Sequence, residues 1–556
     1  MSRLKVRWLS PPVAWKGRGI GDSWAHAMDR QGWSFAGAEE ERDVYFLASE
    51  SQLNDEILSD GKPVVCFFWG WPPGRFTSGS KEDMRKWGAF VQERIELLFR
   101  CAKVLVPGPV TMDQARLLGL TNTQMLLPGV DAEVLDRGAV SGSHAGAIVS
   151  SLVEVRHEIL FLSRLEGHKG LQYLIEAMTL LTQKPHLHVV GPGDPTEYKA
   201  YADKLGVATT FNTEASDDDK VRAILSCQML CHPSEYEGFG MPPLEALYLG
   251  KPVLASGIPQ LRWLLRDTVQ FAETVPEIAE GISWIFSNYP AALEQAKRGQ
   301  ERVHKEFTLD HAALQLTDVL HLAVKADLGE QIRQDPSPGT MRRVYEIEHK
   351  RNADTPGGKV TRFDPTWSRH WRAEAFVTAL TDVGARVIGD IGCGPVYPTI
   401  FARAGFKVRA LDIADEALRQ VREIADTWGV PGADIETFQG RAQELPWADE
   451  SLDAVVLGEI LEHVTDPEVC LAEAWRVTKN LGAIVISTPI GEHHWDPMHI
   501  GPDHGGWDEQ HLEMLIAPYA DQVVRKEQIA EGGAEPSCWL VVLQKDKDIA
   551  AEPQRA

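Results

Sequence analysis

Short runs of apolar and β-branched residues alternate with amphipathic stretches along nearly the whole chain. Runs of this kind at residues 63–69 and 103–106 predict buried strands, and residues 93–98 between them predict a helix. Strands that alternate with helices are typical of parallel sheets joined by crossover helices. The pattern therefore predicts an α/β fold.

The same alternation starts again twice further along the chain. After the Gly-, Ser- and Ala-rich stretch 138–146, strands are predicted at 159–162, 188–190, 229–231 and 252–255, followed by helical residues 290–325. The polar stretch 334–339 holds two prolines and predicts a linker. Residues 345–380 then look helical, with a break at 355–358, and a third alternation spans 387–542. We place domains at 1–145, 146–330 and 370–545, with a lead-in at 331–369 and a tail at 546–556.

Composition limits the possible partners and compartment. The 556 residues carry a net charge of −24, which argues against a nucleic-acid substrate and against an anionic membrane surface. A local basic patch would still permit peripheral membrane contact. Seven scattered cysteines without a CxxC pair are typical of reduced thiols. No apolar run reaches the roughly 18 residues of a membrane helix, and residues 1–15 lack a secretory apolar region. We therefore expect a cytoplasmic protein.

A glycine-bearing turn follows the predicted strand 159–162. It reads Ser-Arg-Leu-Glu-Gly-His-Lys-Gly over residues 163–170 and leads into a helical pattern. A turn between a strand and a helix offers free N–H groups to phosphate. Arg164 and Lys169 would add two cations that stabilise a diphosphate leaving group without a metal. The alternative is a surface turn with two solvated cations.

Two carboxylates eight residues apart, Glu237 and Glu245, flank a string of glycines and prolines. Gly238 and Gly240, on either side of Phe239, would let the backbone approach a ligand closely. The prolines at 242 and 243 suit the first turn of a helix. We expect Glu237 to reach sugar hydroxyls and Glu245 to reach ribose hydroxyls. The alternative is that both carboxylates only cap a helix.

Residues 159–320 resemble the donor-binding domain of family four retaining glycosyltransferases of the GT-B fold. Their Glu-x7-Glu motif is matched by Glu237 and Glu245, their phosphate-binding Arg and Lys by Arg164 and Lys169, and their glycine-bearing strand end by Gly191 and Gly193. The resemblance implies a nucleoside diphosphate sugar donor, transfer with retention and no required metal. It covers most of residues 1–325 and is much weaker before residue 150.

The first 150 residues depart from that family. Where many members carry a catalytic-site histidine, residues 69–73 read Trp-Gly-Trp-Pro-Pro. Trp69 and Trp71 would stack on an acceptor sugar or lie in the core. The glycine-rich first loop is present in loose form over residues 17–23, and Gly19 and Gly21 could approach the donor phosphates.

A second glycine-rich turn follows the apolar strand that begins at Val387. Asp390 precedes Gly392 and Gly394, and Asp412 stands twenty residues after Gly392 at the end of the next apolar run. An acidic residue there can bind the ribose hydroxyls of a nucleoside. This spacing alone suits a dinucleotide as well as other nucleosides.

With the segments 439–447, 452–456 and 459–464, the region 370–545 closely resembles class I S-adenosylmethionine-dependent methyltransferases. The resemblance implies that Gly392 and Gly394 approach the amino acid moiety, Asp412 binds the ribose, and Arg441 and Ala442 flank the adenine. Two residues depart from the family pattern: Val396 replaces a common third glycine, and Arg441 replaces a common acidic residue. The alternative is a structural Rossmann domain without a cofactor.

A sugar hydroxyl needs a base or a metal before it attacks a methyl group efficiently. His463 is the first candidate base. Glu459, Glu462, His463 and His499 also resemble the ligand pattern of magnesium-dependent 2′-O-methyltransferases of small RNA ends, although Glu462 and His463 recur in metal-free relatives. We expect His493, His494, His504 and His511 to belong to a polar loop over the site.

Together these observations predict three Rossmann-like domains, two forming a GT-B glycosyltransferase and one a class I methyltransferase. The expected function is bifunctional: retaining sugar transfer from a nucleoside diphosphate sugar, and O-methylation of a glycan or related hydroxyl by S-adenosylmethionine. Metal dependence of the methylation stays open. One alternative keeps a single catalytic domain beside a degenerate glycan- or nucleotide-binding module. Another makes a protein or an RNA end the methyl acceptor, which the acidic charge disfavours for RNA.

Overall fold

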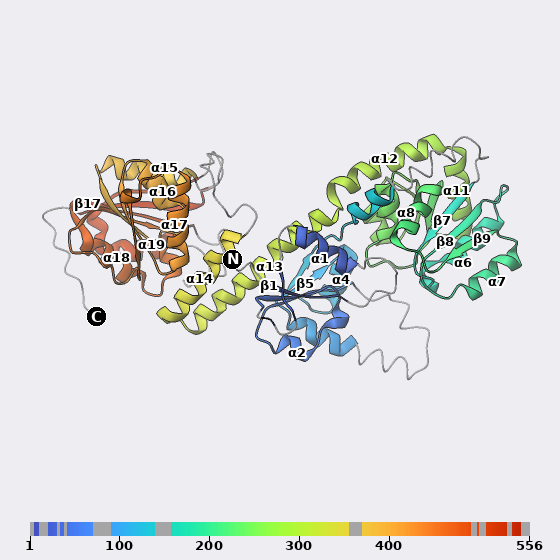
Figure 1. Cartoon of the computed structure of the whole chain (residues 1–556), viewed down its shortest axis with the longest axis horizontal. Coiled ribbons are helices and arrows are strands. Elements are labelled where there is room, and N and C mark those ends of the chain that lie inside the picture. Colours follow the sequence, from blue (N-terminus) through green and yellow to red (C-terminus); the bar gives the residue numbers. More distant parts are fainter. Residues whose placement is uncertain are drawn as a thin grey trace. The chain divides into compact units, whose positions relative to one another are not determined.

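The computed structural model describes residues 5–10, 20–30, 34–37, 40, 42–69, 91–139, 157–354, 370–490, 498–499, 507–530 and 536–545. The chain divides into two compact units, Lys5–Ala323 and Val324–Ala556, the second joined by Met1–Leu4. Figure 1 shows the helices and strands of both units. The predicted fold class, α/β with three Rossmann-like sheets, is confirmed.

The first sheet of the first unit has six parallel strands in the order β2-β1-β3-β4-β5-β6. The predicted strands at 63–69 and 103–106 and the helix at 93–98 are confirmed. Its elements are β1 Lys5–Leu9, α1 Ile20–Arg30, β2 Ser34–Phe35, β3 Val44–Leu47, η1 Glu50–Gln52, α2 Asp55–Leu58, β4 Val64–Phe67, a helix over 91–99, β5 Lys103–Val106, α4 Pro109–Leu117, β6 Thr123–Met125 and a helix over 132–139.

The second sheet has six parallel strands in the order β12-β11-β10-β7-β8-β9. Its elements are β7 Glu158–Leu162, η3 Gly167–Lys169, α6 Leu171–Thr179, β8 His186–Val190, α7 Thr196–Leu205, β9 Thr209–Asn212, α8 Asp217–Ser226, β10 Met229–His232, α9 Met241–Tyr248, β11 Val253–Ser256, α10 Pro259–Leu265, β12 Gln270–Ala272, α11 Val275–Ser287, α12 Tyr289–Glu306 and α13 Leu309–Gln334. All four strands predicted in this region are confirmed.

Alternate residues of β7 supply the two cores of this second sheet. Ile159 and Phe161 face a core built with α6, α7 and α11, whereas Leu160 and Leu162 face one built with α8, α9 and α10. Because successive side chains of a strand point to opposite faces, both faces are covered, as a parallel sheet requires. Figure 1 shows the helices on either side of β7–β9.

The predicted linker at 334–339 is shorter than expected. Helix α13 continues to Gln334, and α14 (Pro338–Asp354) begins after only three non-helical residues. The sequence before Pro336 contains no proline back to Pro290, so nothing in the local chemistry ends the helix earlier. The boundary between the two units falls inside α13.

The sheet of the second unit has seven strands in the order β15-β14-β13-β16-β17-β19-β18, parallel except that β19 runs antiparallel to both neighbours. Its elements are α14, α15 His370–Asp382, β13 Val387–Ile391, α16 Tyr397–Arg403, β14 Lys407–Asp412, α17 Asp415–Thr427, η4 Gly432–Asp434, β15 Ile435–Gln439, β16 Leu452–Gly458, η5 Leu461–His463, α18 Pro467–Val477, β17 Thr478–Pro489, α19 Glu509–Ile516, η8 Ala517–Gln522, β18 Val523–Ile529 and β19 Cys538–Gln544.

Helix α14, before the strands of this unit, is fixed to it by a cap. The Glu346 carboxylate accepts the main-chain N–H groups of Asp415 (2.8 Å) and Glu416 (3.1 Å) at the start of α17. A carboxylate at this end also complements the helix dipole. Helix α14 thereby becomes part of the folded unit.

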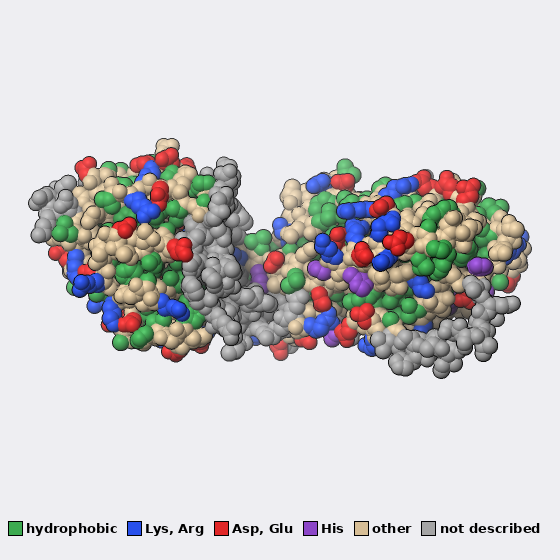
Figure 2. All heavy atoms as spheres, turned by 90° about the horizontal axis from the view of Figure 1, so that it is seen from above, with side chains coloured by type: hydrophobic (Ala, Val, Ile, Leu, Met, Phe, Trp, Pro, Cys, Tyr) green, Lys and Arg blue, Asp and Glu red, His purple; other side chains and the backbone are tan. Residues whose placement is uncertain are grey.

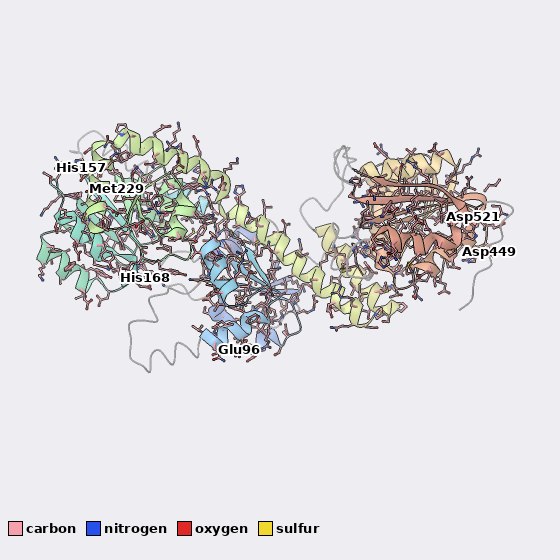
Figure 3. The ribbon with its side chains drawn as sticks, turned by 180° about the vertical axis from the view of Figure 1, so that it is seen from behind. Glu96, His157, His168, Met229, Asp449 and Asp521 are labelled. Atoms are coloured by element: carbon pink, nitrogen blue, oxygen red, sulfur yellow. The ribbon has the colours of Figure 1, made fainter. Side chains whose placement is uncertain are left out.

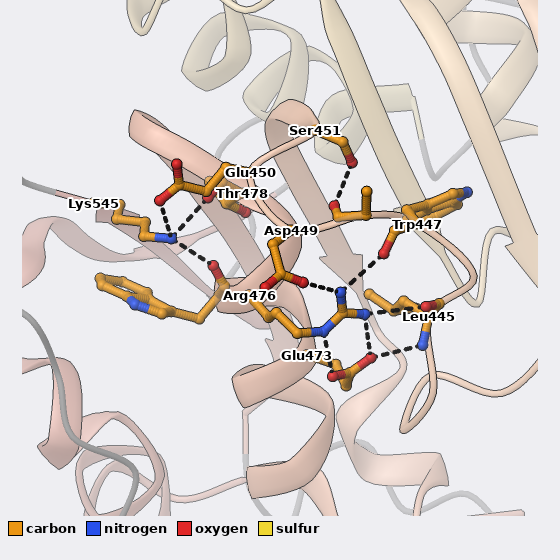
Figure 4. A network of polar contacts seen from close by, with 11 residues as sticks. Leu445, Trp447, Asp449, Glu450, Ser451, Glu473, Arg476, Thr478 and Lys545 are labelled. Atoms are coloured by element: carbon orange, nitrogen blue, oxygen red, sulfur yellow. Dashed lines mark hydrogen bonds and ion pairs between the residues drawn. The ribbon is translucent and has the colours of Figure 1, made fainter.

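One arginine anchors the loop between β15 and β16. Arg476 of α18 pairs with Glu473 and Asp449 and donates to the carbonyls of Leu445 and Trp447, as Figure 4 shows. The pKa of Arg476 is raised, first by its hydrogen bond with Glu473. Because guanidinium donors have a fixed planar geometry, these bonds set the path of the loop that carries Arg441.

The described surface carries charges of both signs. Acidic and basic side chains lie interspersed on the face shown in Figure 2. No helix among the described residues has the length and apolar character needed to cross a membrane. All seven cysteines are free and buried.

Candidate active sites

The two candidate sites each lie where the strand order of a sheet reverses. In open α/β sheets, ligands bind outside the carboxyl ends of strands at such a switch point. The switch lies between β7 and β10 in the second sheet of the first unit, and between β13 and β16 in the second unit. Figure 3 shows His168, which follows β7, at the opposite end of its sheet from His157 and Met229.

Three buried side chains meet at the first switch point. The Lys169 Nζ donates to Glu237 Oε1 at 2.8 Å, and the His232 Nε2 lies 2.8 Å from the same oxygen. Lys169 comes from the turn after β7, His232 ends β10, and Glu237 lies in the loop that follows. Lys169 and Glu237, which the sequence analysis assigned to separate roles, are therefore direct partners in the structure.

The environment of Glu237 keeps it ionised. Burial alone would raise the pKa of its carboxyl, but the charge and hydrogen bond of His232, together with those of Lys169, outweigh burial and lower the pKa below its ordinary value. A fixed carboxylate held by a lysine and a histidine is suited to bind hydroxyl groups or to stabilise positive charge on a ligand.

Two glycines let the loops after β7 and β8 touch. Gly191 has φ +148°, and a Cβ there would lie 1.8 Å from the Ser163 carbonyl oxygen. Gly193 has φ +132°, and its Cβ would lie 2.7 Å from the Leu165 Cβ. Only glycine suits such positions, so the main chain at this edge is open to close approach.

The second carboxylate of the motif has its own cation. Glu245, inside α9, accepts from the Lys220 Nζ of α8 at 2.8 Å, and both side chains are largely buried. Burial would lower the pKa of Lys220, but Glu245, then Asp217 and Asp131, raise it above its ordinary value. The ion pair fixes Glu245 in the second turn of α9, whereas Glu237 lies in the loop before this helix.

Other predicted residues of this site are placed differently. The Arg164 side chain is 58% exposed and pairs with Glu166 at 3.1 Å, so it lies outside the Lys169–Glu237–His232 cluster. The Phe239 side chain is buried in the core. Gly238 and Gly240 form the loop before α9, and a Cβ on Gly238 would lie 2.8 Å from the Trp69 carbonyl oxygen.

The first sheet contributes less to the described site. Trp69 packs on Phe67, with ring centroids 4.4 Å apart, and its indole N–H donates to the Ala48 carbonyl at 2.9 Å. Its ring is therefore held by the protein core. Gly21 lies in the first turn of α1, whereas Gly19 and Trp71 lie outside the described residues.

At the second switch point, Asp412 joins the ends of β13 and β14. Its carboxylate accepts the N–H groups of Gly394 (3.1 Å) and Ala414 (3.0 Å). Gly392 and Gly394 both have positive φ, and nothing lies within 4 Å of a Cβ built on Gly394. The space beside Gly394 is thus open for a ligand next to Asp412.

Asp390 is buried beneath this loop. Burial, and then the charge of Asp412, raise the pKa of its carboxyl well above the ordinary value. Its Oδ2 has no hydrogen-bond partner among the described residues. A buried polar atom of this kind is costly unless a ligand or water satisfies it.

Arg441 and Ala442 follow β15 at the same edge of the sheet. Ala442 is buried in the core, and the Arg441 carbonyl accepts from the Glu444 N–H at 3.2 Å in a tight turn. Val396, at the place of the missing glycine, is buried at the start of α16.

Three of the four residues of the predicted metal pattern lie together. Donor atoms of Glu462, His463 and His499 are all within 4.8 Å of one another. Glu462 is 1% exposed, and its Oε1 has no partner among the described residues. The fourth residue, Glu459, is directed elsewhere: it accepts from Arg372 of α15 and from the Cys538 thiol.

Four histidines were also assigned from the sequence to a polar loop over the site. His493, His494 and His504 lie outside the described residues. His511, in α19, is 48% exposed and pairs with Asp508 at 2.8 Å, away from the cluster.

Two family models match the chain, one in each unit. Residues 149–302 match the family model "Glycosyl transferases group 1", and residues 389–486 match the family model "Methyltransferase domain". The chain carries a glycosyltransferase domain and a methyltransferase domain. The Lys169–Glu237–His232 cluster lies within the first match, and the Gly394–Asp412 and Glu462–His463 pairs lie within the second.

Curated relatives cover the glycosyltransferase domain. The chain is similar to phosphatidyl-myo-inositol mannosyltransferase of Mycobacterium tuberculosis (31% identity, 26% of this chain, 40% of the relative) and to D-inositol 3-phosphate glycosyltransferase of Mycolicibacterium smegmatis (28% identity, 41% and 53%). It thus spans about half or less of these relatives' lengths. Among solved structures, sucrose-phosphate synthase from Thermosynechococcus elongatus aligns over 57% of this chain and 98% of its own (15% identity, TM-score 0.47).

Three contributors to these sites were missed from the sequence. His232 and Lys220 hold the two motif carboxylates, and Tyr345 of α14 packs edge-on to His463 with ring centroids 6.1 Å apart. His232 had a usable signal, because it ends a predicted strand at the edge where ligands bind. Lys220 and Tyr345 lie on helices distant in sequence and carry no local signal.

Proposed function

We propose that this chain is a bifunctional transferase. The glycosyltransferase domain transfers a sugar from a nucleoside diphosphate sugar to a hydroxyl acceptor with retention, and the methyltransferase domain O-methylates a glycan or related hydroxyl. The observation that carries the proposal is the buried Lys169–Glu237–His232 cluster at the switch point of the glycosyltransferase domain. The contact between Gly394 and Asp412 marks a second ligand-binding edge, at the switch point of the methyltransferase domain.

In the glycosyltransferase domain, charge is arranged for departure of a diphosphate. The Lys169 ammonium offers positive charge without a metal, and the lack of a side chain at Gly193 keeps the neighbouring backbone accessible. The ionised Glu237 carboxylate can bind sugar hydroxyls and stabilise positive charge that develops at the anomeric carbon. Glu245, which Lys220 holds, would bind the ribose diol.

The acceptor proposed for this domain is a hydroxyl of a polyol, sugar or glycolipid. The names of the two mycobacterial relatives refer to inositol-based acceptors. The match covers 40% and 53% of these two relatives, so a polyol acceptor is a proposal for this chain.

In the methyltransferase domain, three observations fit S-adenosylmethionine. Open space lies beside Gly394, the Asp412 carboxylate ends β14, and Asp390 holds a buried oxygen without a partner among the described residues. When bound, S-adenosylmethionine supplies an electrophilic methyl group. Asp412 would hold its ribose, the Gly392–Gly394 turn would adjoin its amino acid moiety, and Arg441 and Ala442 would border its adenine.

His463 is the proposed base for the methyl acceptor. It lies at the carboxyl end of β16, beside β13, and the Ile460 side chain of the same turn adjoins Gly392. The second arrangement is a divalent metal held by Glu462, His463 and His499, which would lower the pKa of a coordinated hydroxyl.

A binding experiment on the full chain tests the proposal. Calorimetric titration with UDP, GDP, ADP, dTDP and S-adenosylhomocysteine should identify one diphosphate that binds, together with S-adenosylhomocysteine. Glu245→Gln should weaken diphosphate binding at least tenfold and leave the affinity for S-adenosylhomocysteine unchanged. Asp412→Asn should weaken S-adenosylhomocysteine binding at least tenfold and leave the affinity for the diphosphate unchanged. If only one class of ligand binds, a single catalytic domain beside a degenerate binding module is the correct description.

A further inference from the structure

A buried chain of polar contacts ends on Glu237. The Ser256 hydroxyl of β11 donates to the Ser234 carbonyl at 2.5 Å, the Ser234 Oγ lies 3.4 Å from His232 Nε2, and that nitrogen lies 2.8 Å from Glu237 Oε1. His232 and Ser234 are 1% and 0% exposed. Buried polar groups that satisfy one another in this way fix a single geometry.

Glu237 uses one oxygen for both of its partners. Lys169 and His232 both reach Oε1, and within the described residues Oε2 receives no hydrogen bond. The carboxylate is therefore held at one corner, and its other oxygen is left for a ligand hydroxyl. A carboxylate oxygen can accept two such bonds because it has two lone pairs.

The two partners differ in what else they can do. Lys169 carries a flexible ammonium at the edge of the sheet, in the turn that faces a bound diphosphate under the proposed function. His232 is a rigid ring at the end of a central strand, with its contacts directed into the protein. Any movement of Lys169 toward the diphosphate would leave His232 as the fixed support of Glu237.

We propose that His232 is a positioning residue of the glycosyltransferase. It holds the Glu237 carboxylate by Oε1 and keeps Oε2 directed at the donor sugar, while Lys169 binds the diphosphate. The inference rests on the proposed sugar transfer and identifies the residue that orients its carboxylate. A side chain at position 232 must therefore carry an N–H donor at the place of Nε2.

The test compares two polar substitutions of similar character. In His232→Gln the amide nitrogen can reach the place of Nε2, whereas in His232→Asn it reaches only the place of Nδ1. Steady-state release of the diphosphate from its sugar nucleotide gives kcat and KM for the full-length variants. His188→Asn, at a half-buried histidine of β8 outside the cluster, is the matched control.

We expect His232→Asn to lower kcat at least tenfold with KM for the donor within threefold of wild type. His232→Gln should retain kcat to within about threefold, and His188→Asn should behave as wild type. A loss of transition-state orientation lowers kcat rather than donor binding. Melting temperature and diphosphate affinity, measured on each variant, separate this effect from misfolding.

Several results would overturn the inference. Equal kcat for His232→Gln and His232→Asn would show that the N–H donor has no role, whether both are active or both inactive. An effect confined to KM would make His232 part of donor binding instead. If the wild-type chain bound a diphosphate and released none from any sugar nucleotide, the proposed transfer itself would fail, and the inference with it.

Discussion

One ring nitrogen determines how His463 can act. Its Nδ1 lies 3.3 Å from the Met498 carbonyl oxygen, which can only accept, so Nδ1 carries the hydrogen. A neutral imidazole in this tautomer presents a lone pair at Nε2, which suits either a base or a metal ligand. A metal-binding histidine usually donates its other ring N–H to a carbonyl or a carboxylate, as His463 does to the Met498 carbonyl.

A Co²⁺ titration of the full chain separates these two roles: under the metal arrangement one ion binds, with visible absorption bands typical of nitrogen and oxygen ligands. Two histidines and one carboxylate favour such an ion over Mg²⁺. His499→Ala and Glu462→Gln should each weaken binding at least tenfold, because each removes a ligand. His511→Ala, at an exposed histidine paired with Asp508, should change nothing. If wild type binds no Co²⁺ stoichiometrically, His463 acts as a base without a metal.

The residue scale also shows where inference from sequence stops. That Lys169 and Glu237 lie at the same edge of the sheet could be predicted, because both belong to motifs that end neighbouring strands. The direction of Glu459 could not, because its partners, Arg372 and Cys538, are 87 and 79 residues away. Arg164 matched its motif equally well, yet its side chain pairs with the nearby Glu166.

At the scale of elements, α8 connects a local signal to the donor site. A capping box begins this helix: the Ser216 Oγ accepts from the Asp219 N–H at 3.2 Å, and Asp219 accepts from the Ser216 N–H at 2.9 Å. The next residue, Lys220, holds Glu245. The start of α8 therefore also sets the position of a ligand-binding carboxylate.

This box should be detectable in the pH dependence of stability. The Ser216 side chain, then its backbone N–H and Arg222, lower the pKa of Asp219 to about 2. Because the folded-state pKa is depressed, the stabilisation is complete above about pH 4 and is lost as pH falls toward 2. Asp219→Asn should reduce the free energy of unfolding by about 1 kcal/mol at pH 7.

Urea unfolding of wild type and Asp219→Asn at pH 7 and pH 3 measures this effect. The difference between the two proteins should shrink at pH 3. Asp218→Asn, at an exposed neighbour in the same helix turn, is the control. A difference that stayed constant between the two pH values would contradict the role of the carboxylate charge.

Strand and helix types were largely predictable from apolar periodicity, whereas the ends of helices were not. The continuation of α13 to Gln334 depends on residues such as Ile332, which is fully buried by tertiary packing. Tertiary contacts of this kind override a polar local composition. The same reason explains why the lead-in helix α14 packs on α17 rather than forming a loose connection.

At the scale of the whole molecule, the chain consists of two units with separate cores. We expect two transitions in a calorimetric scan of the full chain. The diphosphate should shift only one of them and S-adenosylhomocysteine only the other. A ligand at 100 times its dissociation constant stabilises its own unit by about 2.7 kcal/mol.

A single transition that both ligands shift together would contradict this independence. Glu346→Ala is a useful internal check, because it removes the cap that joins α14 to α17. It should lower only the transition of the methyltransferase unit. The transition of the glycosyltransferase unit should stay where it is.

The burial of all seven cysteines has a practical consequence for spectroscopy. Thiol reagents react with exposed thiolates, and burial raises the thiol pKa of Cys227, Cys231, Cys470 and Cys538. The native protein should therefore remain almost unlabelled by maleimides. Cysteines introduced at exposed positions such as Glu96 and Asp521 would accept a pair of fluorophores, so distances between the two units could be followed by energy transfer without first replacing a native thiol.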